Sequence, residues 1–331
     1  MTHLRYRWFA LLVVVLLLVG CRRGAEDQVA ARPTTAVTPR STHLPPVPTA
    51  VPVGSEDNPL QVMLLPSESG RSQRAITQAA DDLQPALAAA SGLTIELTLA
   101  DSDADVLAAL CASTPESVTV GWMSGVGYAA AAAADCGTAA LQVARGAADG
   151  ARTGDDVTLV VNRDADIAAI ADIDGKTFCR LDAADLQTNL IPSVMLRASS
   201  GETPVTPLET TDYDDLDTLI DALVAGECDA AGMSAAAYDE RANAAVRAAT
   251  VALTPRSAEI PFAVLMIPSF LPLAQRASLI DAFVTIGNGA QADSLRPILA
   301  HDEIVRAEDA DFVRLRTFFS QAGIDLAALG T

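Results

Sequence analysis

The sequence is poor in basic residues, in aromatic residues and in histidine. It has 22 lysines and arginines against 42 aspartates and glutamates, a formal net charge of -20. Because nucleic acids are bound largely through cations that neutralise phosphates, this balance argues against a nucleic-acid partner. Aromatic residues are only 4% of a chain that is half hydrophobic, so its core must consist mainly of Ala, Val, Leu and Ile. We interpret the acidity as a source of solubility, with attraction of a cationic ligand as the alternative.

Groups that carry enzyme chemistry are also scarce. Lys176 is the only lysine, and His301 is the only histidine beyond residue 43. We expect His301 to lie at a solvated helix end. The sequence contains no G-x-S-x-G elbow, no phosphate-binding G-x-x-x-x-G-K-S/T loop and no H-E-x-x-H. Since a hydrolase needs a nucleophile, a base and an orienting group within reach, we predict a protein that is not an enzyme and holds no cofactor or metal.

The N-terminus predicts export. Arg5 and Arg7 precede the apolar run 8–19, which is too short for the roughly 20 residues of a membrane-spanning helix and is typical of a signal peptide. The run ends in Leu-Val-Gly and Cys21, which resembles a bacterial lipobox. The resemblance implies cleavage before Cys21 and lipidation of its sulfur, a stable anchor on the extracytoplasmic face of the cell membrane. The alternative is an ordinary signal peptide followed by an unrelated cysteine.

Residues 22–57 are rich in proline and threonine and poor in core-forming residues. Such a composition cannot bury enough apolar surface to fold alone. It favours an extended, polyproline-like geometry. We therefore predict a disordered linker between residues 1–21, the signal peptide with its lipobox cysteine, and a folded body that starts at residue 58.

In the folded body, short apolar runs alternate with helical patterns. Alternation of this kind predicts an α/β architecture with parallel sheets. The predicted strands are 60–65, 94–99, 118–123, 139–143, 158–161, 177–181, 229–233 and 264–267. The predicted helices are 71–90, 103–111, 125–134, 192–198, 215–225, 272–286, 293–299 and 309–321, and segment 165–171 continues the alternation.

The middle of the sequence carries a family resemblance. A D-I-D-G-K turn within 170–178 leads into a strand that ends at Asp182, and Pro192 then opens a helix. This order and spacing resemble the phosphate/phosphonate-binding family of ABC-transporter solute-binding proteins. Segments 63–67, 118–128, 219–233 and 260–268 resemble further parts of the family pattern.

The resemblance implies a two-lobed, type 2 periplasmic-binding-protein fold. Each lobe would be a mixed, mostly parallel sheet flanked by helices, with lobe one at 58–153 plus 256–331 and lobe two at 154–255. Two crossings between the lobes, near 153–156 and 253–256, would form a hinge. A small ligand between the lobes would favour a closed form that an ABC permease reads, and we expect a monomer. The alternative is a sensor that presents its ligand state to a membrane receptor.

Four cysteines remain besides Cys21, and an even number in an exported protein suggests disulfides. Four cysteines allow three connectivities. The lobes that the resemblance implies favour Cys111–Cys136 and Cys179–Cys228, because each pair then lies within one lobe. Buried free thiols are the alternative.

Ligand-facing residues are expected where strands end and helices begin. Backbone N–H groups and the helix dipole suit an anion there. In lobe one we expect hydroxyls from Ser67, Ser69 and Ser124, each of which could instead be a helix N-cap. Trp122 and Tyr128 are expected either as an apolar wall of the ligand cleft or as core residues.

The loop after Asp182 departs from the family pattern. Where the family has Ser-Thr-Ser-Gly, this protein has Asp185, Leu186, Gln187 and Thr188. A carboxylate would repel a phosphonate, so Asp182 and Asp185 could instead face an ammonium group. The alternative is that Asp185 only caps the following helix. From lobe two we expect ligand contacts by Asp182, Asp185, Gln187, Thr188, Asn189 and Ser234, with Tyr238 and Asp239 as secondary candidates.

Overall fold

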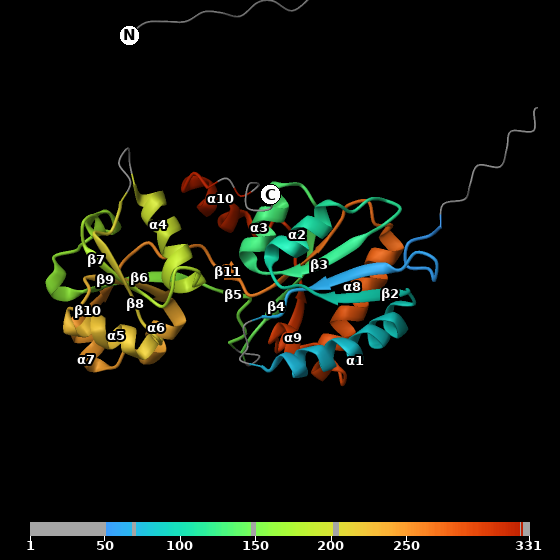
Figure 1. Cartoon of the computed structure of the whole chain (residues 1–331), viewed down its shortest axis with the longest axis horizontal. Coiled ribbons are helices and arrows are strands. Elements are labelled where there is room, and N and C mark those ends of the chain that lie inside the picture. Colours follow the sequence, from blue (N-terminus) through green and yellow to red (C-terminus); the bar gives the residue numbers. More distant parts are fainter. Residues whose placement is uncertain (1–50, 68–70, 147–149, 201–204, 325, 327–331) are drawn as a thin grey trace, which may run out of the picture. The chain divides into compact units, whose positions relative to one another are not determined.

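The computed structural model describes residues 51–67, 71–146, 150–200, 205–324 and 326 (Figure 1). The signal peptide, Cys21, most of the predicted linker and Ser69 lie outside these residues. Within the described part of the protein, no helix is both long and apolar enough to cross a membrane.

The first sheet has the strand order β13-β4-β12-β3-β1-β2. Its centre is parallel, because β1 pairs with both β2 and β3 in parallel register, whereas β12 and β13 run antiparallel to their neighbours. The strands are β1 (Leu60–Leu64), β2 (Ile95–Leu99), β3 (Thr119–Met123), β4 (Thr138–Ala144), β12 (Val264–Ile267) and β13 (Glu303–Arg306).

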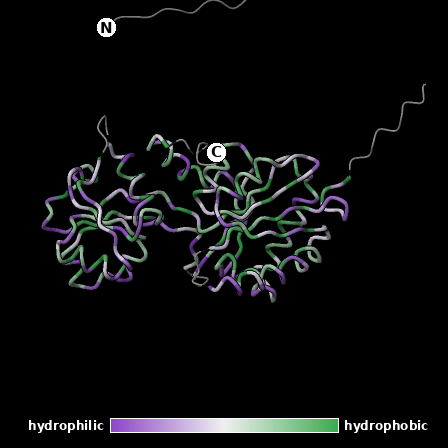
Figure 2. Tube along the Cα trace, viewed as in Figure 1, coloured by the Kyte–Doolittle hydropathy of each residue, from purple (hydrophilic) through white to green (hydrophobic). Residues whose placement is uncertain are grey.

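Helices cover both faces of this sheet (Figure 1). α1 (Gln73–Ser91) and α8 (Leu273–Gly287) pack against each other on one face, and α2 (Asp103–Cys111) and α3 (Gly125–Ala133) lie on the other. α1 buries Ile76, Leu83 and Leu87, a spacing that puts them on one helical stripe. Hydrophobic colours follow the central strands in Figure 2, and hydrophilic colours gather toward the outer loops. We call this sheet with its helices lobe one.

Lobe two is built on a second sheet with the strand order β10-β6-β9-β7-β8. β7 pairs in parallel with β8 and β9, while β6 and β10 are antiparallel. α4 covers one face and α5, α6 and α7 cover the other (Figure 1). The elements are β6 (Val157–Asn162), β7 (Thr177–Arg180), α4 (Ile191–Ser199), β8 (Glu209–Asp212), α5 (Leu216–Ala225), β9 (Ala230–Ser234), α6 (Ala235–Arg241), α7 (Ala244–Ala249) and β10 (Thr250–Ala252).

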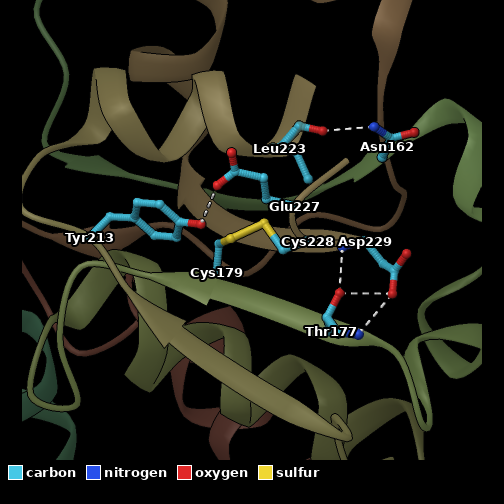
Figure 3. Close-up of a disulfide and its surroundings, with 8 residues drawn as sticks. All are labelled: Asn162, Thr177, Cys179, Tyr213, Leu223, Glu227, Cys228 and Asp229. Carbon is cyan, nitrogen blue, oxygen red and sulfur yellow. Dashed lines mark hydrogen bonds between the residues drawn. A yellow bond between two sulfur atoms is a disulfide. The ribbon is translucent and has the colours of Figure 1, made fainter. Parts of the chain in front are cut away.

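Both predicted disulfides are confirmed. Cys111 joins Cys136 across the ends of α2 and α3, with 4.7 Å between their Cα atoms. Cys179 on β7 joins Cys228 just before β9, with 6.0 Å between Cα atoms. Figure 3 shows that Asp229, the next residue, binds the amide and hydroxyl of Thr177 at 2.8 and 2.9 Å. The bridge and these hydrogen bonds therefore hold β7 and β9 together at one end.

The two sheets are connected by a short antiparallel pair. β5 (Gly154–Asp155) pairs with β11 (Ile260–Pro261), and the amide of Phe262 donates to the carbonyl of Thr153 at 3.1 Å. A side chain at Gly154 would place its Cβ 2.4 Å from the carbonyl oxygen of Ile260, so the close pairing requires glycine there. The second crossing between the lobes thus lies somewhat later than the predicted 253–256.

The segment that follows β12 packs against both lobes. η4 (Ala292–Ser294), α9 (Arg296–Leu299) and β13 belong to lobe one, followed by α10 (Val313–Gln321). Phe312, directly before α10, packs on Tyr128 with 4.4 Å between ring centroids. α10 also contacts α4 of lobe two. This segment is therefore a further link between the lobes.

Several details differ from the sequence predictions. The sheets are mixed, but parallel pairs do not dominate, because β6, β10, β12 and β13 all return antiparallel. Segment 165–171, for which the sequence predicted only that the alternation continues, contains parts of two 3-10 turns, Arg163–Ala165 and Ile170–Ile173. Val53 is buried and its carbonyl accepts from Gln275, so the folded body begins before residue 58.

His301 follows the end of α9, as predicted, but its predicted exposure to solvent was wrong. Its side chain is 1% exposed, and Nε2 lies 3.1 Å from the carbonyl oxygen of Gly287. The backbone turns at Ala300, which has a positive φ of 50°, and this turn carries the ring inward. The burial lowers the pKa of His301 below its ordinary value of 6.5.

Candidate functional site

The carboxyl ends of the parallel strands locate the candidate site. In open α/β sheets, ligands bind outside these strand ends. The linking pair β5 and β11 adjoins both sheets there: Pro261 packs closely on Gly125 after β3, and Asp155 accepts a hydrogen bond from Ser234 at the end of β9. We call the loops at these ends the strand-end site. It includes Ser67, Asp103, Ser124, Asp155, Asp182, Asp185, Gln187, Thr188, Asn189 and Ser234.

At the end of β3, Ser124 is the N-cap of α3, and its Oγ accepts from the amide of Gly127 at 3.2 Å. Asp103, the first residue of α2, binds Ser124 twice. Its Oδ1 accepts from the Ser124 amide at 2.9 Å, and its Oδ2 accepts from the hydroxyl at 2.5 Å. Gly127 makes room for this carboxylate, since a Cβ there would lie 2.2 Å from Asp103 Oδ1. Asp103 therefore binds both the amide and the hydroxyl of the residue that caps α3.

In lobe two, Asp185 caps a helical segment, which is the structural role that the sequence analysis gave as an alternative to contact with an ammonium group. Asp185 is the N-cap of a short π-helical segment, η3 (Leu186–Leu190), which continues into α4. Its Oδ1 accepts from the amides of Gln187 and Thr188 at 3.0 and 2.6 Å, and from the Thr188 hydroxyl at 2.7 Å. The same hydroxyl accepts from the amide of Leu181 at 3.0 Å, and Thr188 is only 2% exposed. Thr188 thus stabilises the loop from within.

The neighbouring loop residues are largely bound to the loop itself. Asn189 donates to the carbonyl of Ala183 at 2.7 Å and accepts from Arg180 at 3.2 Å. Asp182 is exposed, and its Oδ1 accepts from the amide of Ala184 at 2.6 Å. Gln187 is half-buried where η3 packs on β9.

At the end of β9, Ser234 is 4% exposed and caps α6 by accepting from the amide of Ala237. Its hydroxyl donates to Asp155 Oδ2. The other oxygen of Asp155 accepts from Arg152 at 3.2 Å. The end of β9 is thereby tied to the linking strand β5.

The secondary candidates Tyr238 and Asp239 serve local contacts. Tyr238 is buried, with its phenol oxygen 2.8 Å from Thr250 Oγ1. Asp239 is exposed and lies within ion-pair distance of Arg247 and Arg256.

The predicted aromatic wall lies in the core of lobe one. Trp122 and Tyr128 are both 0% exposed, and the Trp122 ring packs edge-on against Phe283 with 5.7 Å between centroids. The core position was one of two predicted for each. Ser67 is half-buried at the end of β1, and both its amide and its hydroxyl donate to the carbonyl of Ile298.

Sequence reasoning missed Asp103 and Asp155. Each lies at a strand end or crossing, so the rule that located the serines would have included them. A hollow of about 380 Å³ lies elsewhere, between α4, residues 255–258 and α10, and includes Met195, Arg256 and Phe318. None of the predicted ligand residues lines it. Among the described residues, no group of three or more His, Cys, Asp or Glu side chains could hold a metal ion.

Residues 64–312 match the model of a family described as the phosphonate periplasmic substrate-binding protein of ABC transporters. The protein belongs to this family. Its members are periplasmic binding proteins rather than enzymes, so the protein has a small-molecule ligand and an ABC permease as partners. No curated protein matches the sequence.

Three solved structures are similar to this chain. A protein of Xanthomonas citri with bound chloride is 13% identical, with a TM-score of 0.56, over 80% of this chain and 97% of that one. The binding component of a phosphonate ABC transporter from Pseudomonas aeruginosa is 17% identical, with a TM-score of 0.48, over 80% and 87%. PhnD1 from Prochlorococcus marinus, in complex with methylphosphonate, is 11% identical, with a TM-score of 0.47, over 82% and 98%. At 13% identity, the similarity to the Xanthomonas citri protein supports the fold and nothing further.

Proposed function

We propose that the protein is a lipid-anchored solute-binding protein that delivers a small ligand to an ABC importer by closure of its two lobes. The observation that carries this proposal is the position of β5 and β11. They link the sheets and contact strand ends of both lobes, through Gly125 on one side and Ser234 on the other. A ligand at the strand-end site therefore lies beside the segments about which the lobes would move.

The membrane anchor is proposed from the N-terminus. Arg5, Arg7, the apolar run and Cys21 occur in the order of a lipoprotein signal. The proline-rich residues that follow would act as a tether. The protein would thus stay at the extracytoplasmic face of the membrane, where it could load ligand and meet its permease.

Closure is proposed to be a rigid-body motion of the lobes. Each lobe has a buried core and a disulfide of its own, and a further cluster of buried residues, which includes α10, contains residues of both lobes. The free energy for closure would come from ligand contacts that only the closed form completes.

Ligand-dependent compaction tests the proposal. The purified protein would be screened by thermal unfolding against phosphonates, phosphate, amines and amino acids, and each hit measured by small-angle X-ray scattering. A ligand at 100 times its Kd should add about 2.7 kcal/mol of stability. We expect at least one compound to raise Tm saturably and to lower the radius of gyration at the same concentrations. A saturable rise in Tm with no compaction would contradict lobe closure.

A further inference from the structure

A second, smaller hollow of about 210 Å³ lies beside the start of α10. It is bordered by β4 of lobe one, by both segments that cross between the lobes and by the residues that lead into α10. Five polar side chains line it, those of Gln142, Thr153, Glu259, Asp311 and Arg314. None of the residues of the strand-end site lines it, so it is a separate candidate site.

Gln142 on β4 turns a buried side chain to this hollow. The residue is 9% exposed, and its neighbours Leu141 and Val143 point into the core on the opposite face of the sheet. Its backbone pairs with β12 and β13, whereas its side-chain amide makes no hydrogen bond with any residue that the structure describes. Buried amides in proteins are nearly always hydrogen-bonded, because an unmade bond costs free energy. An unpartnered amide at the wall of a hollow therefore indicates that a molecule binds inside it.

Charges of both signs border the hollow. Glu259, just before β11, accepts from Thr153 Oγ1, just before β5, at 2.7 Å through Oε1. Asp311 accepts from the amide of Glu308 at 2.8 Å through Oδ2. In the described part of the chain, neither of these carboxylates forms an ion pair, and Arg314 of α10 forms none either. All three groups thus have capacity left for a charged partner.

The size of the hollow favours a small molecule. A water molecule takes up about 30 Å³ in the liquid, so the hollow has room for a molecule about as large as several waters. Clefts that hold drug-sized ligands measure roughly 300–1,000 Å³, which is more than this hollow offers.

The charges favour a zwitterion. An anion alone would meet two carboxylates, and a cation alone would meet the guanidinium of Arg314. A molecule with one ammonium and one carboxylate group satisfies both signs through charge-assisted hydrogen bonds. The amide of Gln142 can donate to an oxygen or accept from an N–H of the same molecule.

We propose that this hollow binds a free α-amino acid, with its carboxylate at Arg314, its ammonium group between Glu259 and Asp311, and a further polar atom at Gln142. The proposal goes beyond the proposed function, because it names a second site and a second class of ligand. It does not depend on what the strand-end site binds.

Calorimetric titration of the purified protein tests the ligand class. The probes are glycine, L-serine and L-glutamine, and acetate and methylamine serve as controls that carry one charge each. We expect at least one of the amino acids to bind saturably. Its affinity should exceed that of acetate and methylamine at least about tenfold, because each control lacks one charge-assisted hydrogen bond.

Substitutions that remove one charge locate the bound amino acid. Arg314→Gln and Glu259→Gln change exposed residues, so both variants should fold, and circular dichroism checks this. Each should weaken binding of the amino acid at least about tenfold. The matched controls are Arg74→Gln and Glu209→Gln, which remove the same charges from exposed residues outside the hollow and should leave the affinity unchanged.

Gln142→Leu gives an independent readout, because leucine is similar in size but has no amide. Without ligand, the variant should be at least as stable to urea as the wild type, since the buried amide has no partner to lose. It should nevertheless bind the amino acid more weakly. A loss of stability without ligand would show that the amide has a structural partner and would overturn the argument from Gln142.

Three other results would also overturn the proposal. If none of the three amino acids binds saturably, the hollow holds water alone. If acetate or methylamine binds as tightly as the amino acids, the ligand class is wrong. If Arg314→Gln and Glu259→Gln bind the amino acid as the wild type does, the amino acid binds elsewhere. Since amino acids are also among the compounds screened for lobe closure, these two variants decide which site produces a response to them.

Discussion

Tyr128 on α3 donates its phenol proton to Asp309 at 3.1 Å, although 181 residues separate them in the sequence. Asp309 also accepts from the amide of Ala139 at the start of β4, and Arg316 of α10 donates to the Tyr128 oxygen. The phenol is fully buried, and this burial and the neighbouring Asp309 raise its pKa well above the ordinary value. These contacts attach the segment that carries α10 to lobe one.

Tyr128→Phe should therefore destabilise the fold. The change leaves Asp309 and Arg316 each without one hydrogen-bond partner in a partly buried place, which costs about 1–3 kcal/mol. Tyr213→Phe is the matched control, since the Tyr213 phenol binds Glu227 at an exposed position, and should cost less than about 0.5 kcal/mol. Urea unfolding measures both. Equal free energies of unfolding for the two variants would contradict the structural role of Tyr128.

The two disulfides should differ in their access to reductant. Cys179 and Cys228 are 0% and 1% exposed, whereas Cys111 is exposed at the end of α2. A thiolate must reach a sulfur atom to reduce a bridge, and a buried bridge becomes accessible only when the lobe opens. Dithiothreitol should therefore reduce Cys111–Cys136 in the native protein at least about tenfold faster than Cys179–Cys228. Timed alkylation followed by peptide mapping measures both rates. Equal rates in the folded protein would contradict this order.

His301 should make stability depend on pH. Burial lowers its pKa below the ordinary 6.5, and Arg296 and Arg145 lower it further, although the Gly287 carbonyl acts in the opposite direction. Between its folded and unfolded pKa values the unfolded protein binds more protons, so stability rises with pH in that window. The free energy of unfolding should fall by up to about 1.4 kcal/mol per unit as pH drops below 6.5.

His301→Asn identifies the source of this dependence. Carboxylates also titrate in acid, so the test compares the slope between pH 7 and pH 5 in variant and wild type, measured by urea unfolding. The variant is expected to have a shallower slope, even if its absolute stability is lower. Identical slopes would mean that His301 does not change its protonation on unfolding.

The elements that sequence patterns predicted best are those with local signals. α2 begins and ends at the predicted Asp103 and Cys111, because Ser102 caps it and Val106, Leu107 and Leu110 form its buried stripe. β8 was missed because all four of its residues are exposed, so it has no apolar alternation to detect. Its place in the sheet comes from pairing with β7, which is a tertiary contact.

The candidate site shows the same contrast between features with local sequence signals and features that depend on tertiary contacts. Ser124 and Ser234, which cap α3 and α6, were predictable from their positions at strand ends, whereas Thr188 lies inside the segment that Asp185 caps. Their charged partners were less so, because Asp103 is 21 residues from Ser124 and Asp155 is 79 residues from Ser234. Only Asp185, three residues before Thr188, was visible as a cap in the sequence. Local spacing thus predicts where a site lies, and the fold decides which groups remain free to bind.

Lipidation at Cys21 should decide the location of the protein. Cys21→Ala removes the thiol that would carry the lipid, so the variant is expected in the soluble extracytoplasmic fraction while the wild type stays with the membrane. Fractionation after a high-salt wash measures this, and Cys111→Ala/Cys136→Ala serves as a control for cysteine loss elsewhere. Membrane association that persists in Cys21→Ala would contradict the anchor.

Gly232 in β9 should control the packing of α4. A Cβ at this position would lie 2.1 Å from Pro192 Cγ and 2.9 Å from Pro192 Cβ, so Gly232→Ala must push the start of α4 away from the sheet. Such overpacking costs about 1–3 kcal/mol. Pro192→Ala removes the ring carbon that causes the closer clash, so the double variant should be more stable than the sum of the single effects predicts, with a coupling of about 0.5–3 kcal/mol. Urea unfolding of all four proteins gives the coupling directly. Strict additivity would show that the strain of Gly232→Ala is relieved somewhere other than at Pro192.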